Sequence, residues 1–147
     1  METKAAIIIY CQYQERCHSE VKNKLYELGC HTPEVGQLLT DMIEMGLLNE
    51  ERFAKAYARG KFRMKQWGRV KIKIELKARN ISDYCIKLGM KEIDDETYEA
   101  TMLHLLGRKE RELNGERSKA VKKGKLYRYM VQKGYESNLV LEYLHEK

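Results

Sequence analysis

The chain has 147 residues, 34% of them charged, and a formal net charge of +6. A chain of this length buries roughly two-thirds of the surface that it exposes when unfolded, enough for one domain or several small modules. The apolar run from Ala5 to Tyr10 is too short to span a bilayer and lacks a small-residue cleavage site, so we expect a cytoplasmic protein with no membrane partner.

Cysteine usage argues against a disulfide framework and against a metal centre. The cysteines do not form closely spaced pairs and no secretory context accompanies them, so we expect reduced thiols. Histidines stand beside two of them, but the ligand spacing typical of zinc sites is missing. We therefore predict no metal and no cofactor, and buried or capping roles for Cys11, Cys17, Cys30 and Cys85.

Residues 1–48 are predicted to form three helices. The second ends at Gly29, and the third begins with Thr32 as the N-cap followed by Pro33 at its first position. Gly46 ends the third helix. The expected core positions of these helices are Ala6, Ile9, Tyr10, Tyr13, Val21, Leu25, Leu28, Val35, Leu38, Leu39 and Met42.

The next predicted helix has one apolar face and one basic face. Phe53 begins an apolar stripe that continues through Tyr57 and Met64 at helical spacing. Lysines and arginines occupy the other side. The helix is predicted to break near Trp67 and Gly68, because glycine gives the backbone the freedom that a tight turn between helices requires.

The segment from Arg69 to Asn80 is ambiguous, because apolar and charged residues alternate with the period of a half-buried strand. A strand needs partners, however, and few other segments have a comparable character. As a helix, Ile72 and Leu76 would form one apolar strip, and Val70 and Ile74 a second strip on nearly the opposite side. We interpret the segment as a helix sandwiched between neighbours.

The rest of the chain repeats this organisation. Asn49, Ser82 and either Asp94 or Asp95 are placed to begin helices, and Gly134 to end one. The expected core positions from residue 82 onwards are Tyr84, Cys85, Leu88, Tyr98, Met102, Leu105, Leu106, Leu113, Leu126, Tyr127, Met130, Val131, Leu139, Val140, Tyr143 and Leu144.

Three helix ends match one another in sequence. Leu25 to Gly29, Leu76 to Asn80 and Met130 to Gly134 each place an apolar residue four positions before a residue that tolerates a left-handed backbone. Similarity that recurs about every 50 residues is typical of a repeat array. We therefore predict an all-α protein of three three-helix repeats, residues 1–48, 49–93 and 94–147. We expect it to be elongated and curved, with a radius of gyration above the roughly 15 Å of a globular protein of this length.

Several ordered motifs resemble one known family. NEERFAKAY, GRVKIKIELKARNI and KLYRYMVQKGYESNLV are similar to the second and third repeats of the RecX regulatory proteins, and ERCHSEVKNKLYELG resembles the first repeat. The resemblance covers nearly the whole chain. It implies an all-helical array that binds the filament of the RecA recombinase on single-stranded DNA and modulates it, most simply by inhibiting its recombinase and SOS co-protease activities.

Two positions depart from the family pattern. Cys17 stands where the family usually has a capping serine, and because a thiol caps poorly we expect this helix start to fray. The turn at Gln66, Trp67 and Gly68 stands where the family often has a glycine-rich turn with proline. We expect Trp67 to be a partly buried core residue, with a partner-facing hot spot as the alternative.

Basic residues are concentrated in two segments. Residues 59–79 hold nine lysines and arginines against one acid, and residues 108–128 hold nine against three, so the remaining chain is net acidic. Such clusters suit phosphates or an acidic protein groove, although a solvated helix face is the simpler explanation. We predict a surface for RecA, and possibly for single- or double-stranded DNA, formed by Arg59, Lys61, Arg63, Lys65, Arg69, Lys71, Lys73, Arg79, Arg117, Lys122, Lys123, Lys125 and Arg128.

No readable motif supports catalysis. Gly60-Lys61 and Gly124-Lys125 lack the upstream glycine and the following serine or threonine of a phosphate-binding loop. The paired acids stand at predicted helix starts, where the helix dipole explains them. We therefore predict a monomeric protein that is not an enzyme.

The alternative function is a helix-turn-helix transcription regulator, because three-helix units with a basic helix also read duplex DNA. Such a regulator would prefer one duplex sequence and would usually dimerise. A filament modulator needs RecA and tolerates any DNA sequence. The two hypotheses therefore differ in what the protein binds.

Overall fold

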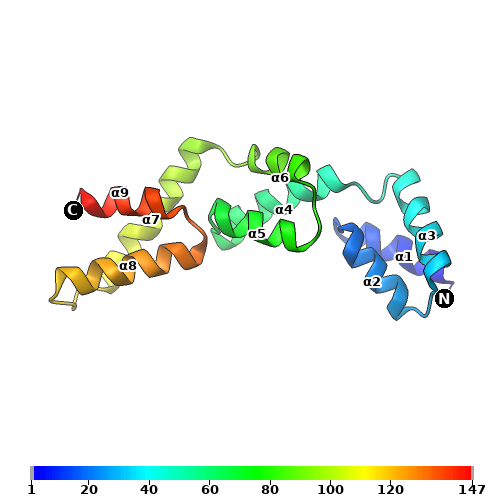
Figure 1. Cartoon of the computed structure of the whole chain (residues 1–147), viewed down its shortest axis with the longest axis horizontal. Helices are drawn as coiled ribbons and strands as arrows, with labels where there is room; N and C mark the ends of the chain where they lie inside the picture. The colour runs from blue at the N-terminus through cyan, green and yellow to red at the C-terminus, as the bar shows by residue number, and fades with distance from the viewer. Residues whose placement is uncertain (1, 147) are drawn as a thin grey trace. The chain divides into compact units, whose positions relative to one another are not determined.

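The computed structural model describes residues 2–146, and every regular element in that range is an α-helix (Figure 1). This confirms the predicted all-α class and the helical interpretation of the alternating segment. None of these helices is both long enough and apolar enough to cross a bilayer. The helices are α1 (Thr3–Tyr13), α2 (His18–Glu27), α3 (Thr32–Glu44), α4 (Glu50–Lys65), α5 (Arg69–Ala78), α6 (Asp83–Met90), α7 (Asp95–Glu112), α8 (Lys119–Lys133) and α9 (Ser137–His145).

The chain divides into two compact units. Unit 1 comprises Met1–Tyr57 and Leu76–Gly89, and unit 2 comprises Ala58–Glu75 and Met90–Lys147. The division passes through α4 and α5, so each of these helices gives residues to both units. The division into repeats 1–48, 49–93 and 94–147 groups the same helices differently and stays a prediction.

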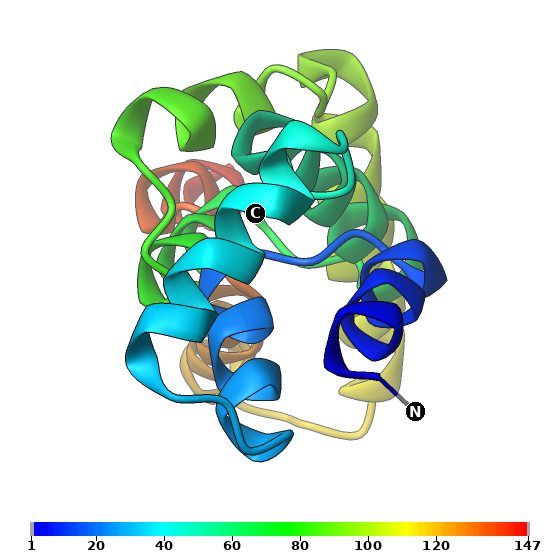
Figure 2. The ribbon, with the colours of Figure 1, turned by 90° about the vertical axis from the view of Figure 1, so that its right-hand side faces the viewer.

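In unit 1, α1, α2 and α3 pack around a shared core (Figure 2). Ile7 and Cys11 are the residues of α1 that face this core, whereas Ile9 and Tyr13 are 53% and 80% exposed. The predicted stripe of α1 was therefore wrong at these two positions, because a helix that is apolar on several sides has no single face for the periodicity to select. The core consists of Ile7, Cys11, Val21, Leu25, Cys30, Val35, Met42 and Leu48.

The rest of unit 1 comes from the start of α4, the end of α5 and α6. Gly89 of α6 lies so close to α4 that a Cβ built on it would be 2.9 Å from the carbonyl oxygen of Ala54. Phe53 is buried, as predicted, and so is Cys85, but Tyr84 is 68% exposed. Tyr84 was predicted to be a core residue, and this was wrong. The buried side of this short helix contains Cys85 and the next residue, Ile86.

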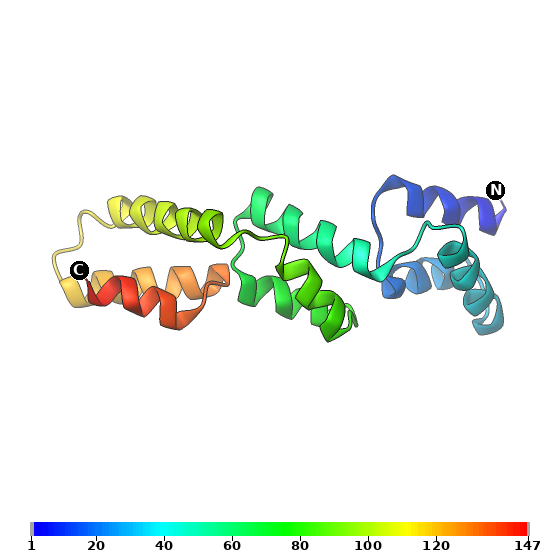
Figure 3. The same ribbon diagram turned by 90° about the horizontal axis from the view of Figure 1, so that it is seen from above.

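In unit 2, α8 packs against both α7 and α9 (Figure 3). The α4 stripe enters this unit through Phe62, which is 7% exposed, and not through the predicted Met64, which is 86% exposed. At 3.6 residues per turn, Met64 lies on the same side of the helix as Phe53, about 20° away, whereas Phe62 lies about 180° away. The pattern therefore favoured Met64, but the part of α4 in unit 2 buries the other side of the helix. The buried residues of unit 2 include Ala58, Phe62, Ile72, Ile93, Tyr98, Met102, Leu105, Leu106, Leu126, Met130, Tyr135, Val140 and Leu144.

Helix α5 buries one side only. Ile72 and Leu76 are fully buried, whereas Val70 and Ile74 are 39% and 60% exposed. The expectation of a helix sandwiched between neighbours is therefore wrong for the described residues. The second apolar strip faces solvent, which explains why the segment alternates in sequence although it is helical.

The predicted N-terminal caps are present at three helices. The side chains of Asn49, Ser82 and Asp94 accept hydrogen bonds from backbone N–H groups three residues later, at 2.8, 3.2 and 2.9 Å. Because these bonds satisfy donors that the first helical turn leaves unpaired, they fix where α4, α6 and α7 begin.

The start of α3 differs from the prediction, and the start of α2 is held by an acid three residues after Cys17. Helix α3 begins at Thr32, so its N-cap is His31, whose backbone N–H donates to the Glu34 carboxylate at 3.3 Å. At α2 the Cys17 thiol makes no cap, but the Cys17 N–H donates to the Glu20 carboxylate at 3.0 Å. In both places a glutamate at the third helical position supplies one half of a capping box.

The three matched helix ends share one backbone conformation. Gly29, Asn80 and Gly134 have φ values of 92°, 61° and 101°, which confirms the prediction of left-handed ends. The N–H of the following residue donates to the carbonyl oxygen five positions earlier, as in a Schellman motif. These bonds are Cys30 to Leu25 at 3.1 Å, Ile81 to Leu76 at 3.2 Å, and Tyr135 to Met130 at 3.1 Å.

Candidate functional site

In unit 2, the turn between α4 and α5 is bonded to the turn between α8 and α9. We call residues 65–70 and 133–136 together the double turn. Both backbone and side-chain groups join its two halves. The bonds run from Gly68 N–H to Lys133 O at 2.8 Å, from Val70 N–H to Gly134 O at 2.9 Å, from Lys133 Nζ to Lys65 O at 2.9 Å, and from the Tyr135 hydroxyl to Gln66 O at 2.9 Å.

Two glycines allow the halves of the double turn to approach. A Cβ built on Gly68 would lie 2.3 Å from the carbonyl oxygen of Gly134, and one built on Gly134 would lie 2.3 Å from the Cβ of Lys71. The left-handed residue of the α4–α5 turn is Gln66, with φ of 57°. Gly68 is therefore needed for space and not, as predicted, for backbone freedom.

Tyr98 of α7 lies beneath the double turn at the centre of an aromatic cluster. Its ring stacks on Tyr135 at a centroid separation of 5.1 Å and lies 5.9 Å from the ring of Phe62. Its hydroxyl accepts from the Arg69 N–H at 3.0 Å and donates to the Glu136 carboxylate. Burial, reinforced by the bond to Glu136, raises the pKa of Tyr98 far above its usual value, so the hydroxyl keeps its proton and its role as a donor.

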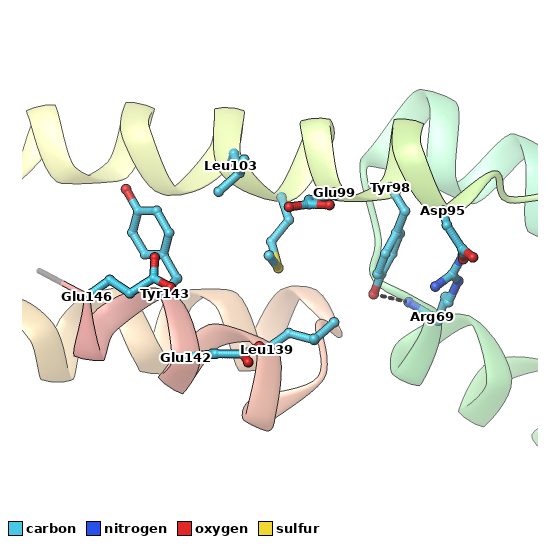
Figure 4. Close-up of a pocket in the computed structure, with 10 residues that line it drawn as sticks. Arg69, Asp95, Tyr98, Glu99, Leu103, Leu139, Glu142, Tyr143 and Glu146 are labelled. Atoms are coloured by element: carbon cyan, nitrogen blue, oxygen red, sulfur yellow. Dashed lines mark hydrogen bonds and ion pairs between the residues drawn. The ribbon is translucent and has the colours of Figure 1, made fainter.

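Arg69 is held by contacts within unit 2 (Figure 4). Its guanidinium donates to the Ile93 carbonyl oxygen at 2.9 Å and to the Asp95 carboxylate at 2.6 Å, and it lies 4.1 Å from the centre of the Tyr98 ring. Only 19% of its side chain is exposed. Arg69 was predicted as a binding residue, but its guanidinium is already engaged, so its evident role is to fasten α5 to α7.

Trp67 occupies the tip of the α4–α5 turn and is half-buried. The side-chain nitrogens of Lys61, Lys65 and Lys71 lie 5.0, 5.7 and 4.6 Å from the centre of its ring. These distances fall in the range of cation–π attraction. The structure therefore brings three of the predicted basic residues together around one aromatic ring.

The other residues of the first basic segment are distributed around α4 and α5. Arg63 and Lys73 are exposed and make no ion pair with any described residue. Arg59 is paired with Glu92 in unit 2. Arg79 belongs to unit 1, where its guanidinium lies 4.9 Å from the Tyr57 ring centre.

The second basic segment surrounds the start of α8. Lys125 pairs with Glu116 at 3.3 Å, and hydrogen bonds from the Ser118 N–H and from Lys125 lower the pKa of Glu116. Arg117 and Arg128 are exposed. A small cavity of about 190 Å³ lies beside this region, lined by Glu110, Lys119, Lys122, Lys123, Leu126, Tyr143 and Leu144.

The second basic segment begins far from the double turn. Helix α8 has 15 residues and is therefore about 22 Å long. The second basic segment runs from the end of α7 through the first ten residues of α8, and the double turn lies at the C-terminal end of α8 (Figures 1 and 3). The start of the second basic segment, at Arg117, is therefore separated from the double turn by the length of α8, whereas Arg128 lies only five residues before Lys133.

A groove between α7 and α9 of unit 2 has a volume of about 530 Å³ (Figure 4). Leu103, Leu139 and Met102 give it an apolar lining. Its remaining lining residues are mostly acidic, in contrast to the rest of the unit: Arg69, Asp95, Tyr98, Glu99, Glu142, Tyr143 and Glu146. Sequence reasoning missed this groove because its residues come from α5, α7 and α9, which are far apart in sequence, and form no motif.

The cysteines and acids do not form a metal centre in the part of the chain that the structure describes. No three His, Cys, Asp or Glu side chains within residues 2–146 gather as a group that could hold an ion. All four cysteines are buried free thiols.

Residues 49–90 match the family model for the second three-helix domain of RecX. The chain is 30% identical over 121 residues to the regulatory protein RecX of Clostridium perfringens (strain SM101 / Type A), covering 82% of this chain and 56% of that protein. It is 25% identical over 137 residues to the regulatory protein RecX of Prosthecochloris aestuarii, covering 93% and 87%. The chain thus spans a little over half the length of the Clostridium relatives and most of the Prosthecochloris relative.

Two solved structures have the same fold. RecX from Lactobacillus salivarius superimposes with a TM-score of 0.82 at 21% identity, covering 99% of this chain and 96% of that one. A second crystal structure of a regulatory protein RecX gives a TM-score of 0.86 at 19% identity, covering 99% and 70%. At these identities the superpositions show the shared all-helical fold.

Proposed function

Because the chain belongs to the RecX family of regulatory proteins, we propose that it binds the filament that RecA forms on single-stranded DNA and inhibits it. The activities affected would be strand exchange and the SOS co-protease activity. The protein itself would catalyse no reaction and would act as a monomer in the cytoplasm.

The observation that carries this proposal is the exposure of basic side chains on helices whose apolar sides are already buried. Arg63 and Lys73 on α4 and α5, Arg117 just before α8, and Arg128 in the second half of α8 can contact a partner without disturbing the core of unit 2. Arginine suits both phosphate and carboxylate through paired hydrogen bonds. These areas therefore suit a filament that exposes protein carboxylates and DNA phosphates.

The distance between Arg117 and the double turn favours a polymeric partner. Two weak contacts on one rigid unit reinforce each other, because the first contact raises the effective concentration of the second. A filament offers the same groups repeatedly along its length, so both contacts can form at once.

The proposal is tested by RecA-dependent ATP hydrolysis on single-stranded DNA with increasing amounts of this protein. We expect Arg63→Glu with Lys73→Glu, and separately Arg117→Glu with Arg128→Glu, to weaken inhibition while helical content and melting temperature stay nearly unchanged. The matched control is Lys22→Glu with Lys87→Glu, which makes the same charge change on exposed residues of unit 1. Arg69 is excluded from the test because its guanidinium holds unit 2 together.

Salt dependence gives a second measure. Each phosphate contact removed from a single strand should reduce the slope of log potency against log salt by about 0.7. Unchanged potency in both well-folded variants would reject this surface and make the acidic areas of the protein the candidates. Selective binding of one duplex sequence without RecA would instead support the transcription regulator.

A further inference from the structure

Trp67 is placed unlike a core tryptophan. The side-chain nitrogens of Lys61, Lys65 and Lys71 lie over its ring, the nearest of them 4.6 Å from the ring centre. Among the described residues, no other aromatic ring stacks on it. Ammonium groups remain hydrated, so a ring that they border lies at the water interface.

The backbone around Trp67 is fixed on both sides. The carbonyl oxygen of Gln66 accepts from the buried Tyr135 hydroxyl at 2.9 Å, and the N–H of Gly68 donates to Lys133 O at 2.8 Å. The Trp67 N–H donates to Lys61 O at 3.3 Å. A side chain on a fixed backbone loses less conformational entropy when a ligand packs on it, which favours binding.

A fourth lysine lies at the same turn. Lys133 Nζ donates to the Lys65 carbonyl oxygen at 2.9 Å, so its ammonium group lies at the same turn. The exposed Arg63 and Lys73 belong to the last turn of α4 and to α5, the two helices that the turn joins. The α4–α5 turn therefore combines the half-buried Trp67 ring with several basic side chains.

The combination of a fixed aromatic ring with surrounding lysines matches the chemistry of single-stranded nucleic acid. Proteins that bind single strands without sequence preference stack bases on aromatic side chains and contact the backbone phosphates with cations. In a duplex the bases are already stacked on one another and are not available to the ring.

We propose that Trp67 is a stacking platform for an unpaired base, and that Lys61, Lys65, Lys71 and Lys133 contact the flanking phosphates. The proposal deepens the proposed function, since single-stranded DNA is the polymer on which the filament forms, but the contact itself requires no RecA. An acidic protein surface would pair with the same lysines and would make no use of the ring face. Nucleic acid therefore explains more of the geometry.

Trp67 is the only tryptophan of the chain, so intrinsic fluorescence reports this site alone. The probes are an oligothymidylate of roughly twelve nucleotides, within the length that one binding module covers, and an abasic strand of the same length and charge. We expect the thymidine strand to quench the fluorescence and to bind about tenfold more tightly than the abasic strand. A duplex of equal length should quench little.

Substitutions separate stacking from charge. Trp67→Leu should weaken binding of a labelled thymidine strand about tenfold, while the salt slope stays the same because the phosphate contacts remain. Trp67→Phe should lie between Trp67→Leu and the parent. The matched control is Tyr84→Leu, which removes an aromatic ring that is 68% exposed in unit 1 and should leave binding unchanged.

Equal affinity of the parent chain for the thymidine and abasic strands would overturn the proposal. If Trp67→Leu does not fold, as judged by circular dichroism, this comparison on the parent chain decides alone. Normal strand binding by a folded Trp67→Leu that no longer affects RecA would also overturn it, and would assign the ring to the filament protein. Base-dependent quenching without any effect on RecA would support the stacking site and reject the proposed function.

Discussion

The helix end at Gly29 in unit 1 and the helix end at Gly134 in unit 2 have the same local structure in different surroundings. Both glycines have a positive φ and both are followed by the same backbone hydrogen bond. A Cβ built on Gly29 would meet nothing within 4 Å, whereas one built on Gly134 would lie 2.3 Å from the Lys71 Cβ and 2.8 Å from the Lys71 N. One motif therefore serves as an isolated turn in unit 1 and as a close contact in unit 2.

The difference shows what a local sequence signal contains. The glycine after a helix specifies the backbone conformation, which depends on neighbours in the chain. It does not specify whether another segment comes close, because that depends on residues far away in sequence. The tightness of the double turn is therefore a tertiary property that Gly29 and Gly134 cannot reveal by their sequence context.

Gly134→Val is expected to have the largest effect. The substitution combines a left-handed backbone, which costs about 1–2 kcal/mol, with an overlap that costs about 1–3 kcal/mol more. The free energy of unfolding should thus fall by about 3 kcal/mol or more, measured by urea denaturation. A Gly134→Val chain with the parent's midpoint would show that the double turn is not tightly packed in solution.

Tyr98→Phe is expected to have an intermediate effect. It removes the hydroxyl that joins the Arg69 N–H to the Glu136 carboxylate, so two polar groups lose their partner, at a cost of about 1–3 kcal/mol. Tyr84→Phe, at an exposed position of unit 1, is the control and should change stability little.

The pH dependence of the parent chain provides a further check on Tyr98. Burial raises the pKa of Tyr98 and of Tyr135 in the folded state, while in the unfolded chain both keep the ordinary value of about 10. The unfolded state therefore releases protons first, so stability is complete below pH of about 10 and falls as the pH rises above it. Tyr98→Phe should show a shallower alkaline loss, and an equal loss would contradict the assignment.

Gly29→Val should have the smallest effect of the three, about 1 kcal/mol, because only the backbone conformation opposes the side chain. Gly29→Asn should cost less, since asparagine tolerates a left-handed backbone and occupies the matching position at Asn80. Thermal unfolding of both variants beside Gly134→Val measures the comparison directly. Equal losses for the two valine variants would remove the distinction between the turns.

Features that depend on neighbouring residues could be predicted from the sequence. The caps at Asn49, Ser82 and Asp94 and the left-handed ends at Gly29 and Gly134 all rest on contacts within a few positions of the chain. The helical nature of α5 was also predictable, although only by comparison with the other helix ends.

Features that depend on which face meets another segment could not be predicted. Met64 and Ile74 continue apolar patterns but lie on the solvent side, because the pattern does not say where the partner helix runs. Arg69 has the sequence appearance of a surface cation, yet Ile93 and Asp95, more than 20 positions away, hold its guanidinium. The lysines around Trp67 were predicted as a basic run, but their gathering on one ring follows from the geometry of the turn.

The cysteines and the tryptophan lie in different units, so each unit carries its own chemical probe. Cys11, Cys17, Cys30 and Cys85 all belong to unit 1, and unit 2 has no cysteine but holds the single tryptophan. Burial raises the pKa of the Cys11 and Cys17 thiols, so little reactive thiolate is present while the unit is closed. The rate at which a thiol reagent modifies the native chain therefore measures how often unit 1 opens, whereas tryptophan emission follows unit 2.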